Sequence, residues 1–268
     1  MGNKGLNPDG TIAREGSLDH VTARFAPVVA AARAEIAGRF GDGRLHSAYV
    51  YGSIPRGTAV PGISDLDLLL VLAEEPTARD RADADAAEGV LDGSFDVIDG
   101  VGVLLVGVGA ALSELERYDL GFFISCLCTP LLGEDLAARL PPQRPTSLLA
   151  RETNGDLALA LPRWRDGLLN ARTDAERRAM CRRIARRVVR SGFTLVMPRW
   201  GGWTSDLHES AELFARYYPR RAAQMRSAAR AARTPTPDPA GLRALTEDLG
   251  PWLAAEYTAV HGEKAARP

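Results

Sequence analysis

A glycine-serine turn followed by two carboxylates, one residue apart, constrains this chain more than any other part of its sequence. Gly52-Ser53 comes directly after one apolar run, and Asp65-Leu66-Asp67 opens the next. Alternate side chains of a β-strand share a face, so Asp65 and Asp67 are expected to point the same way while Leu66 points into the core. Two carboxylates on one face suit a magnesium ion and the phosphates of a nucleotide, because magnesium takes oxygen ligands from carboxylates, water and phosphate.

The turn has the composition of a phosphate-binding loop. Gly52 has no Cβ, so backbone N–H groups and the Ser53 hydroxyl are expected to approach a phosphate closely. Arg56 adds a fixed positive charge beside the same phosphates. The hydroxyls of Thr58 and Ser64 are candidates to orient a carboxylate or a phosphate-contacting amide. We therefore predict that these residues surround the phosphates of a bound nucleotide.

The two motifs together resemble the signature of a known enzyme superfamily. Gly-Ser-x-x-Arg-Gly-Thr-Ala begins at Gly52, and Ser-Asp-x-Asp-Leu begins at Ser64. This pattern is similar to that of the DNA polymerase beta nucleotidyltransferases, including the minimal and the antibiotic nucleotidyltransferases, and the resemblance covers roughly residues 20–105. It implies an enzyme with two magnesium ions, held by Asp65, Asp67 and a third carboxylate, that transfers a nucleotide to a hydroxyl and releases pyrophosphate. ATP is the donor that the resemblance implies.

The third carboxylate is expected on a later strand. Asp96 and Asp99 both follow Phe95 at a suitable distance from the pair, and Asp96 is the predicted ligand or base for the acceptor hydroxyl. Strand parity does not decide between them, because a one-residue slip moves every side chain to the other face. If the strand instead covers 101–106, the corresponding position falls at Gly102, and the site is one carboxylate short.

Two domains are expected. An α+β nucleotidyltransferase domain with a mixed sheet and flanking helices is predicted over 17–140, and an all-helical substrate-binding domain over 146–268. A proline-rich linker separates them, and residues 1–16 are expected to be a mobile lead-in. The elements expected in the first domain are a helix over 21–40 ended by Gly41 and Gly43, strands over 46–51 and 66–72, a helix over 77–91, a third strand after Phe95 and a helix over 112–127.

The helical domain contains an arginine-rich segment. Its members are Arg177, Arg178, Arg182, Arg183, Arg186, Arg187 and Arg190. Their spacing predicts a wide basic stripe along one helix, for which a solvated, salt-bridged face is one interpretation. The other is phosphate binding, because arginine binds phosphate bidentately. Arg183, Arg186 or Arg190 could reach the phosphates, and Arg183 and Arg186 are the predicted nucleotide-binding residues.

Composition excludes several classes of protein. Lys+Arg 33 against Asp+Glu 34 gives a net charge of −1, so no global basic field favours nonspecific nucleic-acid binding. No signal core or membrane-length apolar run is visible, which predicts a cytoplasmic protein without membrane contact. The three cysteines lack metal-ligand spacing and are expected to be free and buried.

Three functions are consistent with the sequence. The first is transfer of AMP from ATP to a hydroxyl of a small molecule such as an antibiotic, as in antibiotic resistance. The second is transfer to tRNA or to a protein, of the toxin-antitoxin type, which the arginine-rich helix favours over a cationic acceptor. The third is a catalytically inactive nucleotide-binding protein, which the loss of the third carboxylate would favour.

Overall fold

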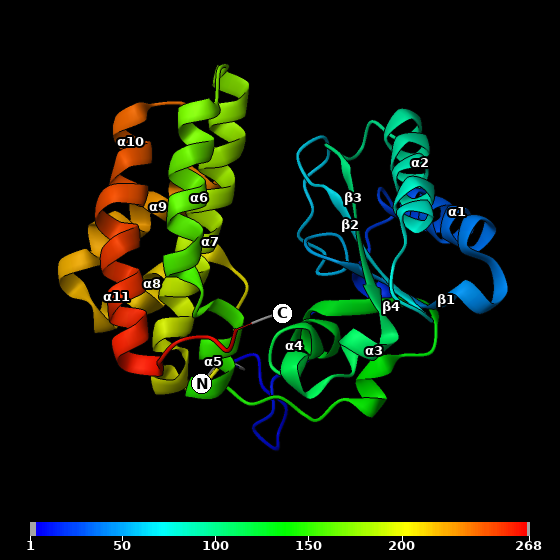
Figure 1. The fold of residues 1–268 in the computed structure, drawn as a ribbon, viewed down its shortest axis with the longest axis horizontal. Helices are drawn as coiled ribbons and strands as arrows, with labels where there is room; N and C mark the ends of the chain where they lie inside the picture. The colour runs from blue at the N-terminus through cyan, green and yellow to red at the C-terminus, as the bar shows by residue number, and fades with distance from the viewer. Residues whose placement is uncertain (1–3, 267–268) are drawn as a thin grey trace. The chain divides into compact units, whose positions relative to one another are not determined.

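The computed structural model describes residues 4–266, apart from the side chain of Asp42. The chain folds as two compact units: one comprises Ala13–Gln143, and the other combines the chain up to Ile12 with the chain from Arg144 onwards. The first unit contains a mixed sheet with flanking helices, and the second is helical (Figure 1). The predicted fold class is therefore confirmed.

The sheet has four strands in the order β3-β2-β1-β4. The strands are β1 (Leu45–Tyr51), β2 (Leu66–Leu72), β3 (Val101–Gly107) and β4 (Cys128–Gly133). β1 pairs antiparallel with both β2 and β4, whereas β2 and β3 are parallel. The predicted second strand has the bounds of β2, and the third strand begins later than Phe95.

β4 was not predicted. A continuous helix expected over 112–127 is replaced by short turns that lead into this strand: α3 (Val108–Ala111), η2 (Glu114–Glu116), α4 (Leu120–Phe122) and η3 (Phe123–Leu127). Pro130 lies within β4, paired with Tyr49 of β1. Proline cannot donate a ladder hydrogen bond, so it is confined to edge strands, and β4 is an edge of this sheet.

Helices α1 (Ala26–Arg44) and α2 (Ala78–Ser94) cover one face of the sheet (Figure 1). Leu66, Leu68 and Leu70 are fully buried beneath them, each contributing roughly 2 kcal/mol of hydrophobic stabilisation. A second cluster around Leu69 and Val71 covers the opposite face. β2 is therefore buried on both faces, which explains its continuous apolar sequence.

The first helix starts and ends later than predicted. Ser17 caps a short 3-10 turn, η1 (Leu18–His20), and α1 begins only at Ala26. Gly41 and Gly43 have left-handed φ angles of 57° and 89°, yet the helix continues to Arg44.

The helical unit is built around one long helix, α7 (Asp174–Trp200). Thr173 and Glu176 form a capping box at its start, and Gly201 ends it in a left-handed conformation. The other elements are α5 (Ser147–Asn154), α6 (Leu157–Asn170), α8 (Leu207–Tyr217), η5 (Pro219–Arg221), α9 (Ala222–Arg233), α10 (Pro239–Arg243), η6 (Ala244–Leu249) and α11 (Gly250–His261). Within residues 4–266, no helix combines the length and apolarity needed to cross a bilayer.

The N-terminal segment packs on the helical unit instead of forming a separate lead-in. The N–H of Trp203 donates to the carbonyl of Lys4 at 2.8 Å. Leu6 and Ile12 form an isolated antiparallel β-bridge, and the side chain of Ile12 is buried. Gly5 has a φ of 69°, and a Cβ there would lie 2.3 Å from the Trp203 carbonyl oxygen. This approach therefore requires glycine.

The three cysteines are free and buried, as predicted. Burial raises the pKa of Cys126 to about 12. Burial also raises the pKa of the Cys128 thiol. These thiols are therefore protonated and unreactive at neutral pH.

We expect Asp80→Asn to destabilise the sheet unit at pH 7 by about 1 kcal/mol. Asp80, on α2, is buried, accepts hydrogen bonds from Thr77 and forms an ion pair with Arg44 at the end of α1. The Thr77 hydrogen bond and then Arg44 lower the pKa of Asp80 to about 2. Because the folded-state pKa lies below the unfolded value, this stabilisation is present above pH 4 and is lost as the pH falls towards 2.

Urea denaturation of the wild type, Asp80→Asn and the exposed control Asp92→Asn, at pH 7 and pH 3, measures the effect. The difference between wild type and Asp80→Asn should shrink at the lower pH. A difference of the same size at both pH values would contradict this assignment.

Candidate functional site

The site forms where β1 ends and β2 begins. Tyr51, the last residue of β1, pairs with Asp67 in the antiparallel register, so the following turn lies beside the Asp67 side chain. Gly52 has a φ of 85°, and a Cβ there would lie 2.6 Å from Oδ2 of Asp67. Both the backbone conformation and the space therefore require glycine at this position.

The two carboxylates lie on the side of the chain that the strand alternation predicts. Leu66 and Leu68 pack beneath α1 and α2, so Asp67, between them, faces the other way. Asp65 immediately precedes β2 and, like Asp67, is partly buried. A Cβ at Gly100 would lie 3.9 Å from Oδ1 of Asp65. The segment that enters β3 therefore passes directly beside the pair.

The two candidates for a third carboxylate lie outside the paired part of β3, although the N–H of Asp99 donates to the carbonyl of Ser64, next to Asp65, at 3.1 Å. β3 begins at Val101, so Asp96 and Asp99 lie in the preceding turn, where both are exposed. The parallel register pairs Asp67 with Gly102, the third of the positions considered from the sequence. Among the described residues, no group of three His, Cys, Asp or Glu side chains is arranged to hold a metal. Asp96 as a third ligand stays a prediction.

The turn after Gly52 is fixed by its own backbone. The N–H of Thr58 donates to the carbonyl of Ser53 at 3.0 Å, and the N–H of Gly57 donates to the carbonyl of Ile54 at 3.1 Å. The Thr58 hydroxyl also donates to the Ser53 carbonyl, at 3.4 Å. Ser64 accepts a hydrogen bond from the N–H of Val60 at 2.9 Å. In these contacts Thr58 and Ser64 hold the backbone of the loop, and their predicted role in orienting a carboxylate or a phosphate-contacting amide stays a prediction.

Arg56 has a partner that sequence reasoning missed. Its guanidinium lies 3.4 Å from the carboxylate of Glu15, which is only 16% exposed. The segment that carries Glu15 lies beside the turn in the folded chain. The N–H of Ser17 donates to the carbonyl of Pro55, and the N–H of Glu15 donates to the carbonyl of Cys126. The Glu15 carboxylate offsets part of the positive charge that Arg56 was expected to provide. No local pattern in the sequence indicates this contact, because the two residues lie far apart in the chain.

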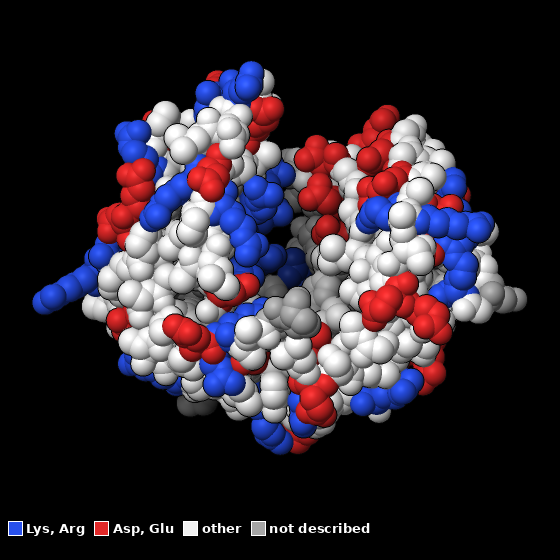
Figure 2. Space-filling view, in the orientation of Figure 1, with Lys and Arg blue, Asp and Glu red and all other residues white. Residues whose placement is uncertain are grey.

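The surface of the sheet unit is acidic near α2. Figure 2 shows Asp and Glu side chains gathered over the part of this unit where α2 and the adjoining ends of β2 and β3 lie in Figure 1. Part of this charge is offset locally: Arg81 contacts Asp85 and Glu88 at 2.6 Å each. An acidic surface favours bound cations and disfavours anions unless a cation accompanies them.

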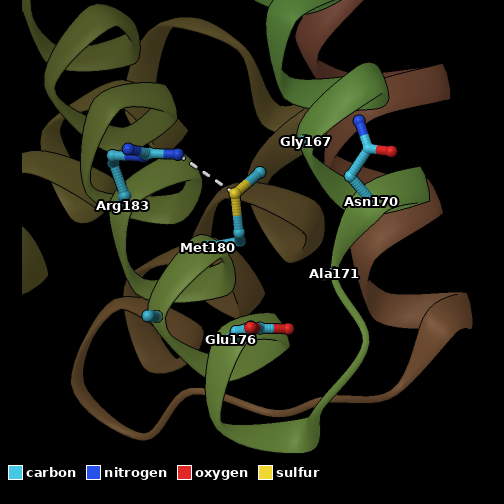
Figure 3. A pocket seen from close by; sticks show the side chains of 7 residues that line it. Gly167, Asn170, Ala171, Glu176, Met180 and Arg183 are labelled. Carbon is cyan, nitrogen blue, oxygen red and sulfur yellow. Dashed lines mark hydrogen bonds between the residues drawn. The ribbon is translucent and has the colours of Figure 1, made fainter.

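The two predicted arginines of the helical unit differ in environment. Arg183 is exposed, and its Nη2 lies 3.0 Å from Sδ of Met180 (Figure 3). Arg186, one turn later on α7, is partly buried. Two other members of the stripe pair with carboxylates, Arg177 with Asp174 at 3.1 Å and Arg187 with Asp156. The solvated, salt-bridged interpretation therefore holds for part of the stripe.

Arg183 also lines an open pocket of about 490 Å³ between α6 and α7. The lining residues are Gly167, Asn170, Ala171, Glu176, Ala179, Met180 and Arg183 (Figure 3). The Glu176 carboxylate accepts the N–H groups of Thr173 and Arg172, which lowers its pKa. The pocket therefore holds a negative charge as well as a positive one, and Arg183 alone does not make it a triphosphate site.

Comparisons with known proteins identify the motif-bearing region. Residues 35–99 match the model of the nucleotidyltransferase domain. The fold is similar to a crystal structure of spectinomycin adenyltransferase AAD(9) from Enterococcus faecialis with ATP and spectinomycin, with a TM-score of 0.55 and 14% sequence identity. The match covers 87% of this chain and 98% of that chain. A sequence comparison with curated proteins finds no match.

We expect Gly52→Ala to abolish nucleotide binding, because its methyl group would displace the Asp67 carboxylate. Gly41→Ala is the matched control: Gly41 also has a positive φ, of 57°, but a Cβ there would meet no described atom within 4 Å. Both substitutions carry the strain of a left-handed alanine, of the order of 1 kcal/mol. Titration with a fluorescent ATP analogue in the presence of magnesium, with thermal melts, separates the effects. Equal binding by the two variants would show that the Gly52 contact is not part of a nucleotide site.

Proposed function

We propose that this chain, whose residues 35–99 match the model of a nucleotidyltransferase domain, transfers AMP from ATP to a hydroxyl of a small molecule such as an antibiotic and releases pyrophosphate. The observation that carries this proposal is the close approach of the Gly52 backbone to Asp67. It puts a turn with phosphate-binding composition beside a carboxylate that is partly buried.

The residues fit the magnesium that this activity requires. Asp65 and Asp67 would hold it, because one or two carboxylates complete a magnesium site when water and substrate phosphates supply the other oxygens. Magnesium would neutralise charge on the phosphates during transfer. The backbone amides that follow Gly52 and the Ser53 hydroxyl would bind the phosphates and orient the α-phosphorus. Arg56 would bind a phosphate only when its ion pair with Glu15 is broken.

A small-molecule acceptor is proposed from the structural comparison. The similar adenyltransferase structure contains ATP and spectinomycin, so this fold accommodates a nucleotide and a small molecule in one protein. The acceptor group that the sequence resemblance implies is a hydroxyl. If the acceptor is an antibiotic, its modification would confer resistance. Transfer to tRNA or protein is the alternative acceptor class, and only the arginines of α7 favour it.

A second candidate function is nucleotide binding without transfer. The specific observation in its favour is Gly102, which occupies the position beside Asp67 where a third carboxylate was considered. A protein of this kind would bind ATP with magnesium but would release no pyrophosphate with any acceptor. The two candidates are therefore separable by one measurement.

We expect pyrophosphate release from ATP and magnesium, in the presence of a pool of hydroxylated and phosphorylated small molecules, to fall at least about a hundredfold in Asp65→Asn and Asp67→Asn. A loss of this size is typical when groups that stabilise transition-state charge are removed. Asp96→Asn is the informative comparison, because it changes a nearby carboxylate that the register does not place beside the pair. A rate within about twofold of the wild type would show that Asp96 is not the third carboxylate. A hundredfold loss in Asp96→Asn would instead assign Asp96 as the third carboxylate.

The arginines of α7 give a separate test. If Arg183 and Arg186 contact the nucleotide, replacement of either by alanine should raise the KM for ATP about tenfold, because one charge-assisted hydrogen bond is worth roughly 1.5 kcal/mol. Arg178→Ala is the control, since Arg178 is an exposed arginine of the same helix. Unchanged KM values in Arg183→Ala and Arg186→Ala would show that these two arginines do not contact the nucleotide.

A further inference from the structure

A serine and a histidine of the helical unit form a pair to which the proposed nucleotidyl transfer gives no role. Ser147 is exposed at the first position of α5, and His261 is the last residue of α11. Oγ of Ser147 lies 2.6 Å from Nδ1 of His261. We propose that Ser147 is a nucleophile activated by His261, and that it takes the acyl group of small carboxylic esters and passes it to water.

The second ring nitrogen of His261 fixes the direction of this hydrogen bond. Nε2 lies 3.1 Å from the carbonyl oxygen of Leu195 on α7, and a carbonyl oxygen only accepts. Nε2 therefore carries the N–H of the neutral imidazole, which leaves a lone pair on Nδ1. The Ser147 hydroxyl must then donate its proton to Nδ1. This is the arrangement of a serine beside a general base, with the base oriented by a third group.

The imidazole is available as a base at neutral pH. Burial lowers the pKa of His261, although its hydrogen bonds to the carbonyls of Leu195 and Thr194 oppose this shift. The ring is therefore neutral at pH 7 and accepts a proton there. A general base works best in this state, unprotonated and with a pKa near the working pH.

Packing holds the imidazole between three helices. α5, α7 and α11 contact one another in the helical unit (Figure 1). The ring of Tyr257, one turn earlier on α11, is buried and lies edge-on to the His261 ring, with the ring centroids 5.0 Å apart. The Tyr257 hydroxyl contacts the carbonyl of Ala150 on α5 and Oγ1 of Thr194 on α7. The base therefore keeps its orientation towards Ser147 through contacts with all three helices.

The start of α5 supplies donors for the negative charge that the reaction develops on the ester oxygen. The first N–H groups of a helix have no partner within the helix. The Thr146 hydroxyl accepts the N–H of Leu149 at 3.2 Å, whereas the N–H groups of Ser147 and Leu148 have no partner among residues 4–266. The N–H of a nucleophile and the N–H of its neighbour are donors that stabilise such an oxyanion. The positive end of the helix dipole acts in the same sense.

The reaction balances with water as the second reactant. Oγ of Ser147 forms a bond to the carbonyl carbon of the ester, its proton moves to Nδ1 of His261, and the π electrons of the carbonyl move to oxygen. The carbonyl then forms again, the bond to the alcohol oxygen breaks, and the alcohol leaves with the proton from Nδ1. Water repeats both steps on the acyl-serine, which releases the carboxylic acid and restores Ser147.

The first test uses the full chain and a fluorophosphonate probe, which reacts with activated serine hydroxyls, followed by mass spectrometry of the labelled peptides. We expect Ser147 to be labelled at least about tenfold faster than Ser94, since a positioned base contributes at least that much. Ser94 is the matched control, because it is an exposed serine at the end of α2 whose hydroxyl donates to the carbonyl of Val90 at 2.6 Å.

Hydrolysis of p-nitrophenyl acetate gives the second readout. We expect the rate above background to fall at least about tenfold in Ser147→Ala and in His261→Asn, and to stay within about twofold of the wild type in Ser94→Ala. Thermal melts control for folding of the variants, and the labelling of the wild type needs no variant.

Two outcomes would overturn the proposal. Labelling of Ser147 no faster than that of Ser94 in the wild type would show that the serine is not activated. Labelling of Ser147 at an unchanged rate in His261→Asn would show that His261 is not its base. ATP takes part in neither measurement, so these outcomes leave the proposed nucleotidyl transfer unaffected.

Discussion

The pairing of Tyr51 with Asp67 is the constraint on which the candidate site depends. It sets the end of β1 against the start of β2, and the turn that follows must then pass the Asp67 carboxylate at a distance only glycine permits. The pairing is fixed by burial on both faces of β2: a one-residue slip would move Leu66 and Leu68 out of the core beneath α1 and α2 and would turn Asp67 into it. The hydrophobic core therefore determines the geometry of a polar site.

Much of this arrangement could be predicted from the sequence, because it depends on short-range patterns. The alternation of Asp65, Leu66, Asp67 and Leu68 gave the face of each side chain, and the apolar run gave the bounds of β2. The capping residues Thr77 and Thr173 mark the starts of α2 and α7, where side-chain oxygens satisfy free N–H groups of the first turn. These features involve neighbours in the chain, for which residue type alone carries the physical information.

Other features depended on long-range contacts and could not be predicted. The start of β3 follows from pairing with β2, and no residue type near Phe95 distinguishes a strand that begins there from one that begins at Val101. β4 contains a proline, which weakens any strand pattern, and is recognisable only once β1 is known to need a partner. The ion pair between Glu15 and Arg56 joins segments that meet only in the folded chain. The same holds for the packing of the N-terminal segment against Trp203.

That packing means that the polypeptide crosses between its two units twice, after Ile12 and after Gln143. Cleavage after Ile12 would leave the two units joined by the peptide bond after Gln143, whereas cleavage after Gln143 would leave them joined only by the noncovalent packing of the first residues on the helical unit. It also means that a helical unit expressed from Arg144 onwards would lack the segment that accepts the N–H of Trp203 and buries Ile12. Dissection of this protein into independent pieces would therefore require the first residues to be grafted onto the second unit, as in a circular permutation.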